Sequence, residues 1–304
     1  MIKKGFGYLF KYGPKELYLK VNDKCKPYDM DYEAYRIKVL PTKEELRNQR
    51  KHTFSYEPRI SVIVPCYNTR VDYFTQMLDS VFSQTYENYQ LCIAIYADEE
   101  HEETKDKLLL YANAHDEISY VILDKNQGIA GNTNEALKLA DGDFIALLDH
   151  DDFYEPDLFY EVVKVINENM DADVIYTDED KVDETSTIYS EPYFKSDFNI
   201  DLLRGNNYIC HEFMVRKTIV DNIGGFNSEF DGAQDYDFIF RCIEEARGIY
   251  HLPKVLYHWR VHSESTAMDP TAKMYAFDAG KHAIEAHLDR MNIFGKVEHL
   301  EERL

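Results

Sequence analysis

The segment Phe144-Ile145-Ala146-Leu147-Leu148 runs directly into Asp149-His150-Asp151-Asp152. Five consecutive apolar residues predict a strand buried on both faces, which is typical of a parallel sheet. The three aspartates would then lie at the end of that strand, where open α/β sheets bind their ligands. Carboxylates this close repel one another, and a hard cation such as Mg²⁺ or Mn²⁺ would relieve the repulsion. The same residues also suit a polar turn or a helix cap.

The surrounding sequence alternates between strand and helix patterns. Residues 60–65 form a second β-branched run, which predicts a buried strand that Pro65 should end. Other strands are predicted at 90–96, 120–123, 173–176 and 212–216, and helices at 72–84, 103–114, 131–140, 156–169, 234–246 and 271–292. Strands separated by helices indicate βαβ units, and therefore an α/β fold with a mostly parallel, Rossmann-like sheet.

Polar residues follow three of the predicted strands: Cys66-Tyr67-Asn68, Lys125-Asn126-Gln127-Gly128 and the aspartate cluster. Each segment alone suits a polar turn. Because the carboxyl ends of parallel strands meet at one edge of a sheet, the three together predict a binding site there. Residues 183–207 have no clear periodicity, so we expect a loop region that helps to form a substrate surface.

The overall charge limits the partners. Lys and Arg number 34 and Asp and Glu 56, which gives 34 − 56 = −22. Such a chain lacks the basic surface that nucleic acids require. A phosphorylated substrate would need a cation beside it. The five cysteines are scattered and form no CxxC pair, so neither a disulfide framework nor a zinc site is indicated.

The predicted organisation is an extension over 1–57, a catalytic domain over 58–268 and a helical segment over 269–304. A Thr-Lys-Glu-Glu signal predicts a helix from Thr42 to Arg50 in the extension. Residues 1–26 contain seven lysines, two acidic residues and several aromatic residues, which suits a solvated extension or contact with an anionic membrane surface. The sequence shows no signal-peptide pattern and no apolar run of about 20 residues. We therefore expect a cytoplasmic protein, either free of the membrane or in peripheral contact with its inner face.

Several segments, taken together and in order, resemble glycosyltransferase family 2. Between about residues 58 and 268 the resemblance rests on Ile60 to Asn68, Asn126-Gln127-Gly128-Ile129, Asn132-Thr133-Asn134-Glu135-Ala136, Leu147 to Asp152, Tyr176 to Lys181, Gly232 to Asp237 and Tyr257-His258-Trp259-Arg260. Within the family the chain is most similar to bacterial enzymes that build O-antigen, capsule or rhamnose-containing polysaccharides. The resemblance implies a GT-A fold, a nucleotide-sugar donor, a divalent metal (Mn²⁺ or Mg²⁺) and inversion at the anomeric carbon.

The resemblance also implies the residues that contact the donor. Pro65, Tyr67 and Asn68 would border the nucleobase, and Asn126 and Gly128 would lie further along the donor cleft. The family usually has an aspartate after the second strand that contacts the base. Here that segment reads Ala94-Ile95-Tyr96-Ala97-Asp98-Glu99-Glu100, in which Asp98 is the candidate at a shifted position. The choice between uridine and deoxythymidine stays open.

The remaining implied roles concern the metal and the chemistry. Asp149 would approach the ribose, and Asp151 would ligate the metal. His258 falls where related enzymes supply another metal or phosphate contact, although it also suits an ordinary histidine in an aromatic stretch. Asp235 matches the catalytic base, because inversion requires a carboxylate opposite the leaving diphosphate to take the proton of the acceptor hydroxyl. Asp235 also suits a helix cap.

The expected function is therefore transfer of a sugar from a UDP- or dTDP-activated donor to a glycan or a lipid-linked glycan. Two alternatives remain open: a non-catalytic module that binds nucleotide sugars or glycans, and a sugar-phosphate nucleotidyltransferase. The second usually carries a Gly-rich basic phosphate loop near its N-terminus, which this chain lacks. A glycoside hydrolase is less consistent with the pattern, because it needs no cation beside the scissile bond. The oligomeric state is not indicated.

Overall fold

A computed structural model describes residues 31–262 and 270–299. The chain divides into two compact units between Leu40 and Pro41. In the first unit the described part consists of helix α2 (Tyr32–Val39), which begins at the N-cap Asp31. The basic and aromatic residues 1–26, proposed above as a membrane contact, lie outside the described residues. Among the residues that the structure describes, no helix combines the length and apolar character needed to cross a bilayer.

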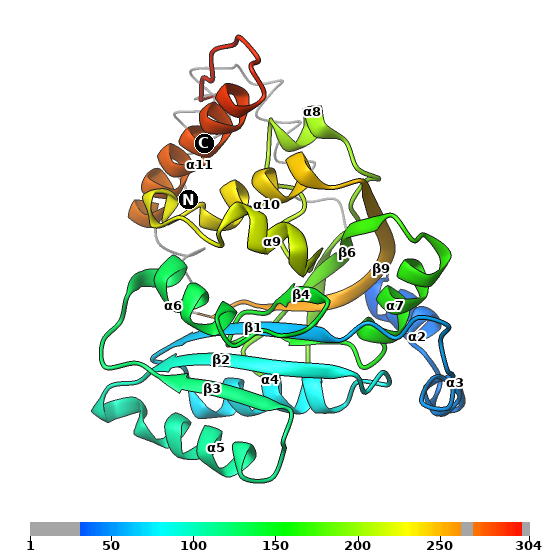
Figure 1. Ribbon diagram of the computed structural model, residues 1–304. Helices are drawn as coiled ribbons and strands as arrows, with labels where there is room; N and C mark the ends of the chain where they lie inside the picture. Colours follow the sequence, from blue (N-terminus) through cyan, green and yellow to red (C-terminus); the bar gives the residue numbers. More distant parts are fainter. Residues whose placement is uncertain (1–30, 263–269, 300–304) are drawn as a thin grey trace, which may run out of the picture. The chain divides into compact units, whose positions relative to one another are not determined.

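The second unit contains one mixed sheet. Within the described residues nine strands take part, eight of them in the order β3-β2-β1-β4-β8-β6-β9-β5, with β7 beside β6 (Figure 1). The strands are β1 (Ile60–Tyr67), β2 (Tyr89–Tyr96), β3 (Ile118–Ile122), β4 (Phe144–Leu147), β5 (Phe153–Tyr154), β6 (Ala172–Val182), β7 (Tyr189–Tyr193), β8 (Phe213–Arg216) and β9 (Gly248–Arg260). Pairing is parallel from β3 to β4 and again between β6 and β9, and antiparallel at β8, β7 and β5. The predicted α/β sheet is confirmed.

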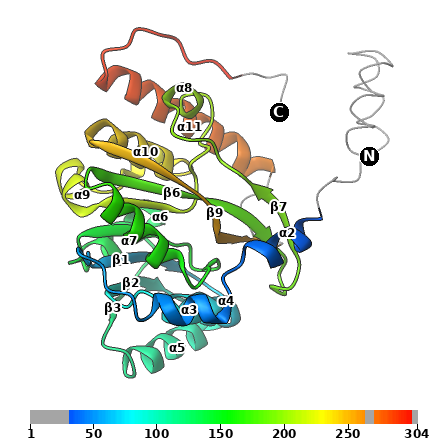
Figure 2. The same ribbon diagram turned by 90° about the vertical axis from the view of Figure 1, so that its right-hand side faces the viewer.

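Helices cover both faces of this sheet, as Figures 1 and 2 show. The described helices of the second unit are α3 (Lys43–Gln49), α4 (Val71–Phe82), α5 (Glu102–Ala112), α6 (Gly128–Leu137), α7 (Leu158–Glu168), α8 (Ile200–Leu203), α9 (Lys217–Ile223), α10 (Gln234–Glu245) and α11 (Pro270–Arg290). Apolar residues of α4 and α7 pack on one face in a first core, and those of α6, α9 and α10 pack on the other face in a second. The sheet is thus buried on both sides, which explains the long apolar runs in its strands.

The capped helix predicted at Thr42 is confirmed as α3. The Thr42 hydroxyl accepts from the Glu45 amide at 3.2 Å, and the Glu45 carboxylate accepts from the Thr42 amide at 2.7 Å. These two bonds form a capping box.

We predicted that strand β1 would end at Pro65, but the strand continues to Tyr67. The pairing with β4 stops at Ile63, so Pro65 is paired on one side only, with Ala94 of β2. A proline, which has no amide hydrogen to donate, is tolerated at such a position.

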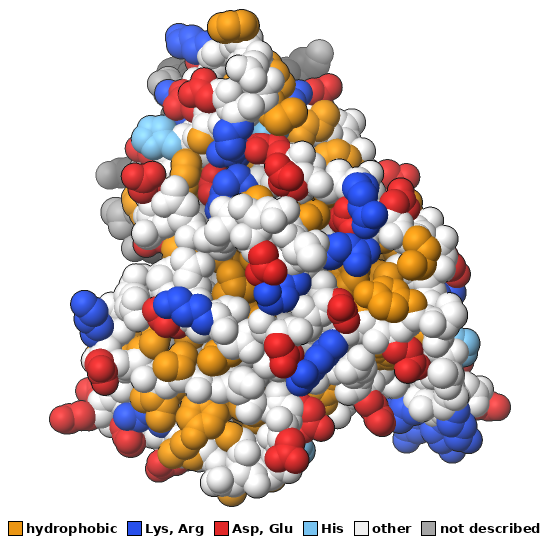
Figure 3. Space-filling view, viewed as in Figure 1, with side chains coloured by type: hydrophobic (Ala, Val, Ile, Leu, Met, Phe, Trp, Pro, Cys, Tyr) orange, Lys and Arg blue, Asp and Glu red, His pale blue; other side chains and the backbone are white. Residues whose placement is uncertain are grey.

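The second half of the chain departs more from the prediction. Strand β6 continues beyond the strand predicted at 173–176, through the acidic stretch Asp178 to Lys181, in which Asp178, Glu179 and Asp180 are buried. The segment 183–207 contains β7 and α8. Strand β9, where no strand was predicted, lies between β6 and β5. Acidic and basic side chains are scattered over the face drawn in Figure 3, apart from a small basic group over α3.

Candidate functional site

A cleft of about 560 Å³ opens where β1 and β4 end. Because these strands are parallel, their carboxyl ends point to the same edge of the sheet. The predicted residues that line the cleft are Pro65, Tyr67, Asn68, Asn126, Asp149 and Asp151. The residues that the sequence did not predict are Thr69, Arg70, Tyr73, His101, Ile129, Asn132, His150, Trp259 and His262.

One end of the cleft is aromatic and carries a fixed carboxylate. The exposed ring of Tyr67 stacks on Tyr96, with centroids 5.9 Å apart and planes 17° apart. Asn68 donates to Asp98 Oδ2 at 2.7 Å and accepts from the Asp98 amide at 3.0 Å. His101 Nδ1 lies 2.6 Å from Asp98 Oδ1 and holds the pKa of that carboxyl below its usual value. Asp98 thus does not line the cleft itself, but it contacts Asn68 and His101, which do.

The loop before α6 forms another wall. Asn126 Oδ1 accepts from the Gly128 amide and from Asn132 Nδ2, both at 3.0 Å. Gly128 has a φ of +80°, which favours glycine. A Cβ at this position would also lie 2.9 Å from Asp231 Oδ2. The predicted donor-side residues of this loop are therefore held by a local network that a larger residue would disturb.

The aspartate cluster places Asp151 beside two imidazoles. His262 Nε2 lies 2.8 Å from Asp151 Oδ2, and His150 Nδ1 lies 3.7 Å from Asp151 Oδ1. Burial raises the pKa of Asp151, but the bond to His262 and the charge of His150 outweigh it and lower that pKa to about 2. The Nδ1 atom of His150 is buried and meets no hydrogen-bond partner among the described residues. An ionised carboxylate beside two imidazoles is a donor set that fits a divalent cation.

Asp152 has a different environment. Tyr257 donates to its Oδ2 at 2.6 Å, and the Arg260 amide donates to its Oδ1 at 2.7 Å. Burial, with Asp151 and Asp149 nearby, raises the pKa of Asp152 well above its usual value. With both oxygens occupied, Asp152 fixes the turn to β9 rather than facing a ligand.

The structure does not support His258 as a second metal ligand. Its ring is buried, with Nδ1 at 2.5 Å from Asp180 and Nε2 at 3.0 Å from Glu155, so carboxylates occupy both nitrogens. His262, four residues further along the chain, is the histidine that lies against Asp151. The sequence contained no spacing signal that distinguished it from His258.

Asp235 lies in the first turn of α10 and is half-buried. Asn207 Nδ2 donates to its Oδ2 at 2.8 Å. Burial raises the pKa of Asp235, Asp149 raises it further and His211 opposes the shift. The structure thus brings the predicted base into the electrostatic field of Asp149, although the two residues are 86 positions apart in the chain.

A buried polar group lies between Asp149 and β6. The fully buried Lys195 donates to Glu179 Oε2 at 2.9 Å and to the carbonyls of Ile209 and His211. His211 Nε2 lies 3.4 Å from Asp149 Oδ2, and His211 Nδ1 lies 3.6 Å from Glu179 Oε2. Sequence reasoning assigned no role to His211 or Lys195, because their partners are at least 14 residues away in the chain.

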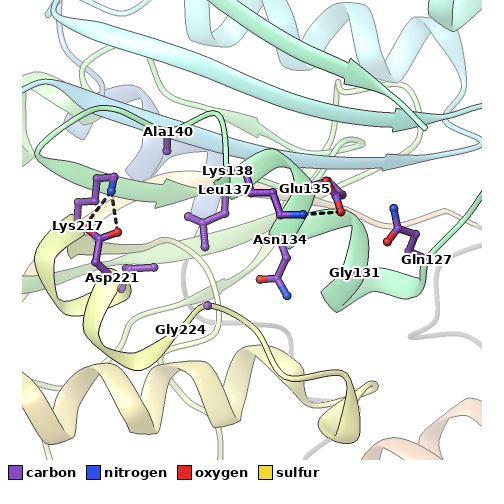
Figure 4. A pocket seen from close by; sticks show the side chains of 12 residues that line it. Gln127, Gly131, Asn134, Glu135, Leu137, Lys138, Ala140, Lys217, Asp221 and Gly224 are labelled. Atoms are coloured by element: carbon purple, nitrogen blue, oxygen red, sulfur yellow. Dashed lines mark hydrogen bonds and ion pairs between the residues drawn. The ribbon is translucent and has the colours of Figure 1, made fainter. Parts of the chain in front are cut away.

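A second hollow of about 580 Å³ lies between α6 and α9 (Figure 4). Its two lysines are already paired with carboxylates: Lys138 with Glu135 at 2.8 Å and Lys217 with Asp221 at 2.7 Å. The hollow thus has as many carboxylates as lysines in its lining, and no excess of positive charge that would attract a phosphate. The cleft at Asp149 to Asp151 is therefore the better candidate site.

Comparison with known proteins identifies the family to which the chain is similar. The family model described as glycosyl transferase family 2 matches residues 61–224. Over 235 residues the chain is 43% identical to the uncharacterized protein y4gI of Sinorhizobium fredii, covering 77% of this chain and 26% of that protein. Over 261 residues it is 29% identical to the O-antigen biosynthesis protein RfbC of Myxococcus xanthus, covering 86% and 20%. The chain thus spans about a fifth to a quarter of these relatives.

A solved structure shares the fold. The crystal structure of Staphylococcus aureus TarS 1-349 in complex with UDP-GlcNAc superposes with a TM-score of 0.62 at 21% identity, covering 78% of this chain and 68% of that one. The likeness confirms the predicted GT-A fold.

Proposed function

Because the chain belongs to glycosyl transferase family 2, we propose that it transfers a sugar from a nucleotide-diphosphate donor to a glycan acceptor, with inversion at the anomeric carbon. One observation carries this proposal. A single cleft joins an exposed aromatic ring, Tyr67, to an ionised carboxylate and an imidazole, Asp151 and His262. These are the two features that a nucleotide diphosphate needs, since its base stacks on aromatic rings and its charge needs a cation.

The donor would lie along the cleft in a defined direction. Pro65, Tyr67 and Asn68 would border the base. Asp98 would act indirectly, through the two hydrogen bonds that join it to Asn68. Asn126 and Gly128 would follow, and Asp149 would approach the ribose. In this arrangement Arg70, which lines the same cleft, lies on the base side. The UDP-GlcNAc in the similar TarS structure supports a nucleotide sugar as the donor.

Asp151 and His262 are the residues that we assign to a divalent cation, Mn²⁺ or Mg²⁺. When bound, the cation would offset the charge of the donor diphosphate. The low pKa of Asp151 keeps this ligand ionised at neutral pH. His150, whose buried Nδ1 atom meets no partner among the described residues, is a further candidate on the same side.

The chemical step would use Asp235. An acceptor hydroxyl attacks the anomeric carbon from the face opposite the leaving diphosphate. A new carbon–oxygen bond forms, the bond from the anomeric carbon to the phosphate oxygen breaks, and the nucleoside diphosphate departs with the bonding electrons. Asp235 takes the hydroxyl proton as the oxygen attacks. Asn207 donates to its Oδ2 and so helps to fix the orientation of the carboxylate.

The acceptor in this proposal is a glycan, free or lipid-linked, of a cell-surface polysaccharide. The relative named for O-antigen biosynthesis supports this choice. We assign the catalytic domain to residues 58–268, which contain every residue given a role above.

Thermal unfolding tests the donor and metal roles. We expect one member of a panel of UDP- and dTDP-sugars, in the presence of Mn²⁺, to stabilise the protein by about 2.7 kcal/mol at 100 times its Kd. Asp151→Asn should abolish the Mn²⁺-dependent part of the shift. Asp235→Asn should keep the thermal shift. Its rate of nucleoside diphosphate release from the donor should fall by about 100-fold or more relative to the wild-type protein.

Asp201→Asn is the matched control, because Asp201 is an exposed aspartate on α8, 85% accessible. It should change neither the shift nor the turnover. If no nucleotide sugar shifts the transition, the proposed function is wrong. A shift without any turnover in the wild-type protein would favour a binding module instead.

A further inference from the structure

His211 occupies a position that neither the donor roles nor the base explains. Its side chain is 24% exposed and lies between two carboxylates from different parts of the sheet. Nε2 faces Asp149, which follows β4, and Nδ1 faces Glu179 on β6. One ring thus bridges the donor cleft and the acidic stretch of β6.

The ring of His211 is fixed from several sides. It stacks on Tyr257, with centroids 4.8 Å apart and planes 12° apart. Its backbone amide donates to Glu179 Oε2 at 3.2 Å, and its carbonyl accepts from Lys195. A histidine held at the ring, the amide and the carbonyl has lost most of its conformational freedom. That loss of entropy suits a group that must keep one orientation.

The same stack connects His211 to the aspartate turn. Tyr257, beneath the imidazole, donates its hydroxyl to Asp152 at 2.6 Å, and the Asp149 amide donates to that hydroxyl at 3.4 Å. His211 and Tyr257 therefore hold the turn on both sides, the first through the Asp149 carboxylate and the second through Asp152 and the Asp149 amide.

The electrostatic surroundings of His211 are almost entirely acidic. The residues in contact with it are Asp149, Glu179, Cys210, Tyr257 and Trp259, and Glu179 also holds Lys195. Three further carboxyl groups interact with it electrostatically: Asp152 from the turn, Glu212 beside it and Asp235 from α10. Burial lowers the pKa of His211, but Cys210, Asp149 and Glu179 together raise it well above its usual value. Of the facing groups, Lys195 is the other cation, and Glu179 already holds it.

A metal held by His211 together with Asp149 and Asp152 is a weaker alternative. Ligand atoms of His211, Asp149 and Asp152 come within 4.8 Å of one another. However, both oxygens of Asp152 already accept hydrogen bonds, from Tyr257 and from the Arg260 amide. Of these three residues, only His211 and Asp149 could then contribute, and they already contact each other.

We propose that His211 is a positioning residue of the transfer step, which aims the Asp149 carboxylate at the donor. The inference rests on the proposed function, because it concerns the same donor. A ring nitrogen that is held between Glu179 and Asp149 orients the Asp149 carboxylate by direct contact.

Two substitutions separate this role from packing. His211→Phe keeps a ring that can stack on Tyr257 but removes both nitrogens. His211→Gln removes the ring but keeps a donor toward Asp149. We expect kcat for release of nucleoside diphosphate from the stabilising nucleotide sugar to fall by about 100-fold in His211→Phe and by about 10-fold in His211→Gln. KM for that nucleotide sugar should change by less than about threefold in both.

His115→Phe is the matched control, because His115 also stacks on an aromatic ring, Phe82, at 3.9 Å between centroids, and lies outside the site. Its kcat should equal that of the wild-type protein. All measurements use the full chain with Mn²⁺, and a melting temperature accompanies each variant to show that it is folded.

Three outcomes would overturn the inference. Wild-type kcat in His211→Phe would show that only the ring matters, and a higher KM with unchanged kcat would place His211 in donor binding. A folded His211→Gln protein less active than His211→Phe would contradict the role of the nitrogen. These results leave the proposed function intact, whereas a wild-type protein that neither binds nor turns over any nucleotide sugar overturns both.

Discussion

His258, which the family resemblance offered as a metal or phosphate contact, has a structural role in the sheet. Its two ring nitrogens contact Asp180 and Glu155, and the ring packs against Phe153 and Tyr189. Burial lowers the pKa of His258, but the two carboxylates raise it to about 9. The residue is therefore a buried cation that joins β6 to β9 and to the end of β5.

This charge predicts a pH-dependent stability. The folded pKa of His258 lies above its unfolded value of about 6.5, so its contribution is complete below pH 6.5 and is lost as the pH rises through 9. We expect His258→Gln to lower the free energy of unfolding by about 3 kcal/mol at pH 6, and by clearly less at pH 9.5. Urea denaturation at the two pH values measures this, and His115→Gln serves as the control. An equal loss at both values would contradict the assignment.

The residues of the site were predictable to different degrees. Asp149 and Asp151 follow a buried strand directly, so the run of apolar residues was enough to place them at the edge of the sheet. Asp235 and His258 came only from the family resemblance, and neither is among the residues that line the cleft, although Asp149 raises the pKa of Asp235. His262 and His211 act through partners more than 30 residues away, which no local pattern records.

At the scale of the element, α3 depends on its cap. The helix has seven residues and none of them is buried, so packing contributes little and the capping box at Thr42 and Glu45 carries much of its stability. We expect Thr42→Ala to cost the helix about 1 kcal/mol, which increases amide exchange in its first turns roughly fivefold. Hydrogen exchange measures this locally, and Thr42→Ser should preserve the wild-type rates. Unchanged exchange in Thr42→Ala would show that the box is dispensable.

Helices and strands were predictable where apolar runs or capping residues mark them. They were not predictable where polar side chains are buried and hydrogen-bonded to distant partners. The first four parallel strands have such runs. In β6 the carboxylates Asp178 and Asp180 are buried against His251 and His258, so hydropathy alone ended the predicted strand at residue 176. Strand β9 contains Pro253 and mixes polar with apolar residues, so it has no apolar run and was not predicted at all.

At the scale of the whole molecule, Asp173 connects three neighbouring strands of the sheet, β8, β6 and β9. Its carboxylate, 3% accessible, accepts from Arg216 of β8 at 2.6 Å and from Arg247, just before β9, at 2.7 Å. Burial raises the pKa of Asp173, but the arginines and the Arg247 amide hold it far below its usual value. One buried charge thus contacts two cations from segments 31 residues apart.

Acid sensitivity follows from this contact. A carboxyl with a lowered folded pKa stabilises the protein above its unfolded pKa of about 3.9, and this contribution is lost as the pH falls below that value. We expect Asp173→Asn to reduce the free energy of unfolding by about 3 kcal/mol at pH 7 and to flatten its decline below pH 4. Urea denaturation between pH 3 and pH 7 is the measurement. The exposed Asp201→Asn should follow the wild-type curve, and parallel acid curves for Asp173→Asn and wild type would refute the prediction.

The position of β9 has a consequence for how the protein can be divided. The family match ends at residue 224, yet β9 enters the sheet afterwards and fills the place between β6 and β5. In a fragment that ends at that boundary, β6 would lack its parallel neighbour β9. The aspartate turn would lack its hydrogen bonds from Tyr257 and Arg260. The segment by which the family is recognised is therefore not an autonomous folding unit. Exchanges of this domain between relatives would need a junction beyond Arg260.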